Sequence, residues 1–272
     1  MKRVLITGAA GRIGKVLSAG LSDANFFLRL CDINPITPDN TNQEAIQLDI
    51  QDLTNLETAM QGIDCVVHMA GIAHEDNWNN ILSVNITGTY NVFEAARLAG
   101  VKRVIFASSN HAVGFYKKQH TLTSDVLPRP DSLYGVSKVF GEALGRLYAD
   151  KHGLSVACLR IGSFMEKPTQ PRHLRTWVSH QDMVRLVRSC IDAPNYHYVT
   201  LYAVSANTQS NWENTLEGQS IAETLKFYPQ DNAELFANEI EFRQETEDKT
   251  TDEFHGGAMC SNNFSGDPRC TK

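Results

Sequence analysis

A tyrosine and a lysine four residues apart, in the segment Tyr134-Gly-Val-Ser-Lys138, are the residues with the most evident chemistry. On a helix this spacing places both side chains on one face, one turn apart. A free tyrosine has a pKa of ~10 and is a poor base at neutral pH, whereas a nearby ammonium favours the phenolate. The phenolate can then take the proton of a substrate hydroxyl as hydride leaves the adjacent carbon. The pair predicts oxidation of an alcohol, although by itself it also fits an exposed helix face.

Two polar residues upstream complete a catalytic set. Ser109 follows the apolar run Arg103–Ala107, which predicts a strand, and the carboxyl ends of such strands present ligand-facing groups. The Ser109 hydroxyl can orient the substrate oxygen that Tyr134 deprotonates. Asn85 is predicted to hold a helix open and to carry a water to Lys138. We therefore predict four catalytic residues: Tyr134, Lys138, Ser109 and Asn85.

A glycine-rich turn near the start of the chain predicts a phosphate-binding site. The segment Thr7-Gly-Ala-Ala-Gly-Arg-Ile-Gly14 joins a short apolar run to an amphipathic one. Glycine permits a tight turn there and lets backbone N–H groups and the helix N-terminus approach a pyrophosphate. The spacing is G-x-x-G-x-x-G rather than G-x-G-x-x-G, so a purely structural turn is the alternative. Beside the catalytic set, the turn predicts a dinucleotide site with contacts from Gly8, Gly11, Arg12, Ile13 and Gly14.

Acidic residues after the next predicted strands bear on which dinucleotide binds. Asp32 ends the second strand, where a carboxylate can accept hydrogen bonds from the adenosine ribose and would repel the 2′-phosphate of NADP. We therefore predict NAD, with a turn-capping role as the alternative for Asp32. Asp49 ends the third strand, where it can meet the adenine edge or form a turn. Lys138 is also predicted to bind the nicotinamide ribose. The remaining predicted cofactor contacts are Ile50, Ala70 and Gly71.

Short β-rich runs alternate with helical stretches along the chain. The predicted strands are Arg3–Thr7, Phe26–Cys31, Ala45–Leu48, Cys65–Met69, Arg103–Ala107, Val156–Ile161 and Tyr198–Ala203. The predicted helices between them are Arg12–Leu21, Leu53–Met60, Ile81–Leu98, Leu133–Lys151 and Gln181–Ile191. This order predicts an α/β fold: a doubly wound parallel sheet of the Rossmann type, with helices on both faces. Ser179, with Asp182 three residues later, predicts a capping box for the last helix.

The pattern weakens beyond about Ala206, where Asn, Gln, Glu and Thr become frequent. We divide the chain into residues 1–205, a NAD-binding core with the catalytic residues, and residues 206–272, a small C-terminal subdomain on the substrate side. The two parts are expected to form a single integrated domain. One helix is predicted over Asn232–Phe242. From Arg243 the chain is polar and is predicted to lie on the surface, as a tail or across a neighbouring subunit.

Composition and charge limit the class of protein. The 272 residues are 42% hydrophobic, which is ordinary for a packed globular core. The formal net charge of −6 argues against nucleic acid as a partner, and no apolar run reaches the length of about eighteen residues that a membrane span needs. The N-terminus lacks the apolar core of a signal peptide. The six cysteines show neither C-x-x-C nor zinc-ligand spacing, which predicts buried free thiols, no metal site and a reducing cytoplasm.

These motifs together resemble the extended branch of the short-chain dehydrogenase/reductase superfamily over roughly the first 200 residues. The matching positions are the glycine turn, Asp32, His68-Met-Ala-Gly71, Asn85, Ser109, Tyr134 and Lys138. A narrower resemblance, to the bacterial uronate dehydrogenases, rests on longer segments: Phe106–His111, Arg129–Lys138, Arg160–Ser163, Thr176–His180, Asp231–Glu234 and His255–Gly257. It implies NAD-dependent oxidation of a hexuronic acid, such as glucuronate or galacturonate, at C1 to the aldarolactone.

The resemblance also implies the substrate contacts, which are Ala73, Ser109, Asn110, His111, Tyr134, Ser163 and Arg172. Ala73 departs from the family pattern, in which a serine follows Gly-Ile, so one hydroxyl contact to the sugar is lost; His74 is the candidate replacement. Residue chemistry supports Arg172, because an acidic protein that binds an anionic sugar needs a local cation, and a guanidinium can clamp a carboxylate with two parallel hydrogen bonds. A solvated loop arginine is the alternative, and a lone histidine such as His111 is more often structural.

Two other classes of protein stay open. A sugar-nucleotide epimerase or dehydratase would use the same Tyr/Lys pair with tightly held NAD, although such proteins usually carry a larger C-terminal region than this chain has. A non-catalytic NAD-sensing module is the second, and such scaffolds commonly lack the tyrosine or the lysine. A small-molecule substrate and a homo-oligomer are expected, because superfamily members usually associate through the helices that carry Asn85 and Tyr134.

Overall fold

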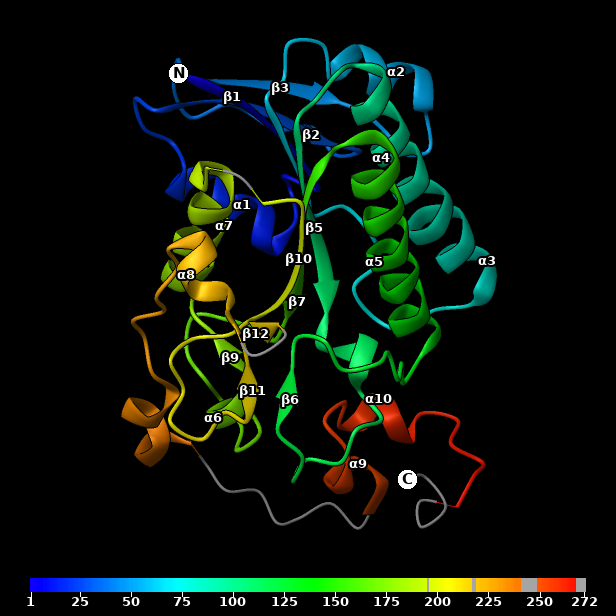
Figure 1. Ribbon diagram of the computed structural model, residues 1–272, viewed down its shortest axis with the longest axis vertical. Helices are drawn as coiled ribbons and strands as arrows, with labels where there is room; N and C mark the ends of the chain where they lie inside the picture. The colour runs from blue at the N-terminus through cyan, green and yellow to red at the C-terminus, as the bar shows by residue number, and fades with distance from the viewer. Residues whose placement is uncertain (195, 217–218, 241–248, 268–272) are drawn as a thin grey trace.

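A seven-stranded parallel sheet forms the centre of the molecule (Figure 1). The computed structural model describes residues 1–194, 196–216, 219–240 and 249–267. The strands of the sheet are β1 (Lys2–Thr7), β2 (Phe26–Asp32), β3 (Gln43–Gln47), β4 (Cys65–His68), β5 (Arg103–Ser109), β7 (Ser155–Ile161) and β10 (Tyr198–Ala203). Their order is β10-β7-β5-β4-β1-β2-β3, so all seven predicted strands and the doubly wound parallel fold are confirmed.

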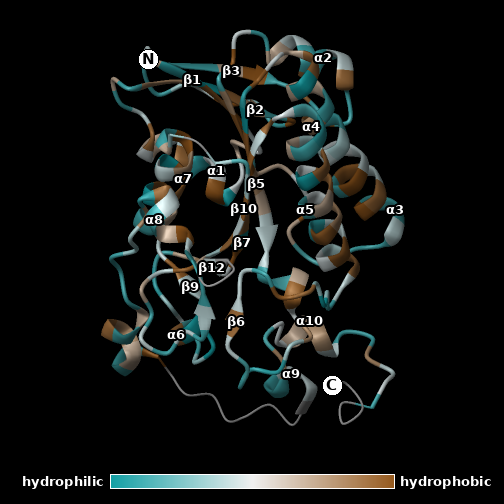
Figure 2. Ribbon diagram, viewed as in Figure 1, coloured by the Kyte–Doolittle hydropathy of each residue, from teal (hydrophilic) through white to brown (hydrophobic). Residues whose placement is uncertain are grey.

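Helices cover both faces of this sheet (Figure 1). The helices α1 (Arg12–Gly20) and α7 (His180–Asp192) lie on one face, and α2 (Leu53–Ala59), α4 (Gly88–Leu98) and α5 (Leu133–His152) lie on the other. Each face has its own apolar core: Val4 and Ile6 belong to one cluster and Leu5 to the other. Successive strand residues point to opposite faces, so one short strand supplies both cores. The helices correspondingly carry both apolar and polar residues in Figure 2.

Helix α5 carries Tyr134 and Lys138, and both of its ends are defined by local sequence. The Ser132 hydroxyl accepts a hydrogen bond from the Gly135 N–H (2.9 Å), which satisfies a free donor of the first turn. At the other end Gly153 has φ of 72°, the left-handed conformation that glycine adopts at little cost. In the middle, a Cβ on Gly141 would overlap the ring of Phe106, so glycine allows α5 to lie close against β5.

The predicted helix Ile81–Leu98 is present, but its first half is a π-helix rather than an α-helix. The structure has a short α3 (Trp78–Asn80), then a π-helix, η1 (Ile81–Thr87), and only then α4. Asn85 lies inside the π-helix, and its side chain accepts from the Ile72 N–H (2.8 Å) and donates to the Ile72 carbonyl (3.0 Å). The wider turn accommodates this inward side chain, which apolar periodicity does not reveal. Asn85 thus fixes the backbone of the neighbouring loop.

Helix α7 begins at the predicted cap. The Asp182 N–H donates to the Ser179 hydroxyl (2.9 Å), as the capping-box prediction requires. The Asp182 carboxylate, however, does not accept a hydrogen bond from the Ser179 backbone N–H, which would be the second half of a capping box. It accepts from the backbone N–H groups of Gln230 (2.9 Å) and Asp231 (3.0 Å), and so attaches the C-terminal region to the core.

The remaining elements are short and surround the carboxyl end of the sheet. The strands are β6 (Leu122–Thr123), β8 (Ser163–Phe164), β9 (Trp177–Val178), β11 (Trp212–Glu213), β12 (Thr215–Leu216) and β13 (Gln219–Ser220). The helices are η2 (Asn110–Val113), α6 (His173–Thr176), α8 (Ile221–Leu225), η3 (Ala233–Glu239), α9 (Lys249–Glu253) and α10 (Ala258–Ser261). The helix predicted over Asn232–Phe242 is instead the 3₁₀ helix η3, and Phe242 lies outside the described residues.

The part of the polar C-terminal segment that the structure describes, residues 249–267, is not the surface tail that its composition predicts; residues 243–248 and 268–272 lie outside the described residues. Phe254 is fully buried, and His255 and Cys260 are buried beside it. Backbone hydrogen bonds join the segment to the loop after β5: the His255 N–H donates to the Tyr116 carbonyl (2.9 Å) and the Gly256 N–H to the Gly114 carbonyl (2.9 Å). Pairing between distant backbones buries the segment, which composition cannot show.

Five of the six cysteines lie in the described part of the chain. They are Cys31, Cys65, Cys158, Cys190 and Cys260, and all five are buried free thiols, as predicted. Cys270 lies outside the described residues. Within the described ranges, no helix is both long and apolar enough to cross a bilayer.

Candidate active site

A cavity of about 410 Å³ opens at the carboxyl ends of β1, β4, β5 and β7. The sheet order reverses between β1 and β4, and ligands bind at such a switch point in open α/β sheets. Most of the predicted site residues line the cavity: Gly8, Gly11, Arg12, Ile13, Gly14, Gly71, Ala73, Ser109, Asn110, His111, Tyr134, Lys138, Ser163 and Arg172. The fold therefore brings the glycine turn and three of the predicted catalytic residues, Ser109, Tyr134 and Lys138, to one space.

The glycine turn has the shape that a dinucleotide phosphate requires. Gly8 has φ of 69°, and a Cβ there would lie 2.6 Å from the Ala70 nitrogen. A Cβ on Gly14 would overlap the Gly8 carbonyl oxygen, so the turn packs onto itself without side chains. The turn leads directly into α1, whose first N–H groups face the cavity end of the sheet. These residues fit a bound pyrophosphate.

Asp32 lies beside this turn, at the end of β2. One carboxylate oxygen accepts from the Ala10 N–H (3.0 Å) and the other from the Asn34 N–H (2.9 Å). Asp32 therefore caps a turn, and it also stands at the strand end where a ribose would lie. Asp49 is exposed and accepts from the Gln51 N–H (2.9 Å), which is a turn-forming role.

Three further predicted site residues, Ile50, Ala70 and Asn85, do not line the cavity but contact the segments that form its walls. Ile50 is buried against Gly88 of α4, where a Cβ would lie 2.6 Å from its Cδ1. The Ala70 N–H donates to the Thr7 hydroxyl (3.2 Å), which holds the end of β4 next to the glycine turn. Asn85 is buried under the Ile72 backbone and donates to the Ser137 hydroxyl (3.0 Å).

Tyr134 and Lys138 lie together in the cavity wall, as their spacing predicts. The Lys138 Nζ is 5.4 Å from the centroid of the Tyr134 ring and 5.2 Å from that of Phe106. Burial raises the pKa of Tyr134 to about 12, against a hydrogen bond with Ser109 that lowers it. Burial lowers the pKa of Lys138 to about 8. Two groups with shifted proton affinities at the end of a sheet are typical of a catalytic site.

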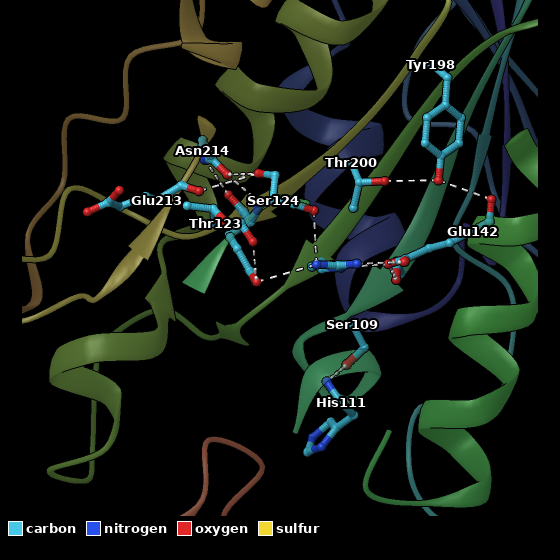
Figure 3. A network of polar contacts seen from close by, with 12 residues as sticks. Ser109, His111, Thr123, Ser124, Glu142, Tyr198, Thr200, Glu213 and Asn214 are labelled. Carbon is cyan, nitrogen blue, oxygen red and sulfur yellow. Dashed lines mark hydrogen bonds and ion pairs between the residues drawn. The ribbon is translucent and has the colours of Figure 1, made fainter. Parts of the chain in front are cut away.

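Ser109 and the two residues after it form one wall of the cavity. The Ser109 hydroxyl accepts from the His111 N–H (3.2 Å) and so caps η2, as Figure 3 shows. Asn110 is buried, and its Nδ2 is a donor without a hydrogen-bond partner within the described structure. A buried amide donor is costly to leave unpaired, so its place in the cavity wall favours an oxygen-rich ligand.

A buried ion pair supports this wall from behind. Arg160 of β7 forms two hydrogen bonds with Glu142 of α5 (2.9 and 3.0 Å), and the Ser108 hydroxyl donates to the same carboxylate (2.6 Å). Figure 3 shows Glu142 within this network; its backbone carbonyl accepts from the Tyr198 hydroxyl, which in turn accepts from the Thr200 hydroxyl. Because α5, β5 and β7 are joined here, Ser109 and Lys138 hold fixed positions relative to each other.

Glu75 is a functional residue that the sequence did not single out. Its two carboxylate oxygens accept from the backbone N–H groups of Leu133 (3.1 Å) and Tyr134 (2.9 Å), the first residues of α5. A carboxylate there interacts favourably with the helix dipole. Glu75 thereby joins the loop that contains Ala73 to the helix that carries Tyr134.

Arg172 enters the cavity from the substrate side. One guanidinium NH₂ donates to the His255 carbonyl (3.3 Å), and the group packs against Gly257, where a Cβ would lie 3.2 Å from it. Burial lowers the pKa of Arg172, although Asp131 opposes this. Within the described ranges Arg172 forms no ion pair with a carboxylate, so its charge is available to a ligand.

Two other predicted substrate contacts differ in what their side chains offer. Ser163 lines the cavity, but its hydroxyl already forms a hydrogen bond with that of Thr176 (2.8 Å). His74 is exposed and does not line the cavity, so it does not replace the missing serine hydroxyl at Ala73. Cavity residues outside the prediction are mostly apolar strand ends and their neighbours: Met69, Ile72, Ala107, Ser108, Ile161, Gly162, Phe164 and Met165. Their place at strand ends was the signal that could have found them.

The fold and the site together define a dinucleotide-dependent oxidoreductase of the short-chain type, with a tyrosine, a lysine and a serine in one cavity at the end of a doubly wound sheet. The chain belongs to the NAD dependent epimerase/dehydratase family, whose model matches residues 4–180. This confirms the resemblance that the motifs indicated, and the residues described above fit the cofactor of that family.

Relatives of this chain include uronate dehydrogenases and also a dehydrogenase named for a different sugar. The chain is 36% identical over 267 residues to a uronate dehydrogenase of Pseudomonas syringae pv. tomato, which covers 97% of this chain and 95% of that protein. It is also 36% identical to an NAD-dependent glucose-6-phosphate dehydrogenase of Haloferax volcanii, over 88% of this chain and 97% of that one. A crystal structure of a tyrosine-to-alanine mutant of uronate dehydrogenase from Agrobacterium tumefaciens, complexed with NAD, is similar at 40% identity and a TM-score of 0.90, covering 96% of this chain and 98% of that one.

Proposed function

We propose that this protein oxidises a hexuronic acid, such as glucuronate or galacturonate, at C1 to the aldarolactone with NAD. The observation that carries the proposal is Arg172, a half-buried cation in the same cavity as Ser109 and Tyr134. A planar guanidinium binds a carboxylate with two parallel hydrogen bonds, and its burial strengthens that attraction. Both the reacting hydroxyl and the acid group of a uronate would then have partners in one cavity.

The proton step is assigned to residues of the chain. The C1 hydroxyl of the sugar would lie between the Ser109 hydroxyl, which orients it, and the Tyr134 oxygen, which takes its proton. As the O–H bond breaks, its electrons form the C=O bond, and the hydride leaves C1. The chemistry that NAD supplies when bound is acceptance of this hydride.

Lys138 makes the proton step feasible. The pKa of about 12 for Tyr134 in the protein alone means that the phenol is protonated at neutral pH, so it must first release its own proton to solvent before it can act as the base. The Lys138 ammonium, 5.4 Å from the ring, stabilises the negative oxygen that must form. Asn85 and Glu75 hold the flanking loop and the first turn of α5, and so keep this geometry fixed.

Similar proteins act on different sugars, so the substrate needs a direct test. The Haloferax volcanii relative is named for glucose 6-phosphate, whose phosphate would also pair with Arg172. The experiment is formation of NADH at saturating NAD with glucuronate, galacturonate, glucose 6-phosphate and neutral glucose. Turnover with uronates, and little with glucose, is expected. Preference for the phosphate sugar would overturn the uronate assignment. Rapid isomerisation of a nucleotide sugar without net NADH would instead identify an epimerase.

A homo-oligomer and a cytoplasmic location stay predictions. Support for self-association comes from exposed apolar side chains on α4 and α5, such as Tyr90, Val136 and Leu147. Exposed apolar side chains mark protein contacts where they gather into a patch. Light scattering of the purified protein tests the oligomer directly, and a monomer at all concentrations would contradict it.

A further inference from the structure

A buried carboxylate lies directly behind the cavity wall and faces a cavity histidine. Asp131 is in the loop before α5, and its side chain has no exposed surface. One of its oxygens is 2.7 Å from Nδ1 of His111. The other oxygen accepts from the Ser132 hydroxyl (2.7 Å). Neither the sequence motifs nor the proposed chemistry of the site assigns a role to Asp131.

The surroundings of Asp131 are built to enclose it. A Cβ on Gly114 or on Gly256 would overlap its Oδ2, so both positions require glycine. The Cys260 thiol lies 3.8 Å from the same oxygen. Gly256 and Cys260 belong to the C-terminal segment, so that segment excludes water from Asp131. A carboxylate in a dry environment binds a hydrogen-bond donor strongly and is expensive to leave unpaired.

The charged and titratable groups around the Asp131 carboxylate determine which nitrogen of His111 carries a proton. Arg172 acts electrostatically on Asp131 from the substrate side, while His111 makes the direct contact. An acceptor-only carboxylate at Nδ1 requires the ring to carry a proton on that nitrogen. In a neutral ring, Nε2 then has a free lone pair. No hydrogen bond joins Nε2 to another residue within the described ranges, and His111 lines the cavity.

We infer that Asp131 is a positioning residue that fixes His111 with Nδ1–H on the carboxylate and Nε2 facing the ligand, where Nε2 accepts a hydrogen bond from a sugar hydroxyl. The edge-to-face contact of the His111 and Tyr134 rings, 5.8 Å between centroids, places the imidazole next to Tyr134. Arg172 then binds the carboxylate of the sugar and His111 binds one of its hydroxyls, so the two residues recognise different parts of one sugar. This division of roles rests on the proposed function, whereas the state of the imidazole does not.

The first experiment measures the ring itself. Long-range ¹H–¹⁵N spectra of the ligand-free protein, at a mildly alkaline pH, distinguish the two nitrogens of each histidine, and the spectrum of His111→Gln identifies the resonances of His111. We expect a protonated Nδ1 and an unprotonated Nε2. A proton on Nε2 would overturn the inference, whether Nδ1 is protonated or not. This result does not depend on the substrate, so it stands or fails separately from the uronate assignment.

The second experiment is a double-mutant cycle with Asp131→Asn and His111→Ala, read as KM and kcat for a uronate. We expect Asp131→Asn alone to lower kcat/KM about tenfold, mainly through KM, because the ring loses its fixed orientation. In the His111→Ala background the same change should have less than about a twofold effect. Equal losses in both backgrounds would show that Asp131 only supports the scaffold. Asp150→Asn, exposed at the far end of α5, is the matched control and should leave both constants unchanged.

Discussion

Replacing Lys138 by methionine should stabilise the folded protein while abolishing its chemistry. The ammonium is buried, and this burial lowers the pKa of Lys138 from 10.5 to about 8. At about 1.4 kcal/mol per pH unit, a charged Lys138 therefore opposes folding by about 3 kcal/mol at neutral pH. Methionine has a similar length and no charge, so most of that free energy should be recovered.

The sign of the pH dependence makes this prediction specific. The folded protein binds the Lys138 proton less tightly than the unfolded chain does, so unfolding takes up a proton between about pH 8 and 10.5. The stability of the wild type rises over that window as the lysine becomes neutral in both states. The advantage of Lys138→Met should accordingly be about 3 kcal/mol below pH 8 and should vanish above pH 10.5.

Urea unfolding of the NAD-free protein at several pH values measures this difference. Lys151→Met, an exposed lysine at the end of the same helix, is the control and should change the free energy of unfolding very little. NADH formation by Lys138→Met should fall by at least ~10²-fold, because the phenolate of Tyr134 loses its cation. A less stable Lys138→Met protein, or a gain that is constant across pH, would refute the reasoning.

Four further substitutions test individual roles. Tyr134→Phe should lower kcat by at least ~10²-fold with an unchanged melting temperature, and near-normal turnover would contradict the assignment of the base. Arg172→Lys should raise KM for a uronate about tenfold but not KM for a neutral sugar, because an ammonium cannot reproduce the planar fork; a constant KM would exclude the clamp. Asp32→Ala should lower the ratio of kcat/KM with NAD to that with NADP, and an unaltered ratio would show that the carboxylate only caps its turn. Glu75→Gln keeps one acceptor and loses the charge at the start of α5, so the free energy of unfolding in urea should fall by about 1 kcal/mol; no change would mean that Glu75 does not anchor the helix.

Local patterns in the chain were enough to predict the sheet and the proximity of Tyr134 and Lys138. Short apolar runs separated by amphipathic stretches predicted all seven strands, because the periodicity of a strand or helix depends on neighbouring residues. The same locality explains the errors. The π-helix around Asn85 depends on a hydrogen bond to a loop thirteen residues away, and the buried Phe254 depends on pairing with a loop far earlier in the chain. Neither contact leaves a periodic signal in the sequence.

The sequence by itself determined which chemical groups this protein contains and how they are spaced along the chain. They are a phenol and an ammonium one helical turn apart, a serine at a strand end and glycines where a pyrophosphate can approach. Only the tertiary structure decided which groups flank them. It placed the Glu75 carboxylate on the first turn of α5, enclosed Asp131 behind His111, and brought the C-terminal segment against Arg172. The reason is physical, since spacing fixes the contacts within one element, whereas contacts between distant segments arise only when the whole chain packs.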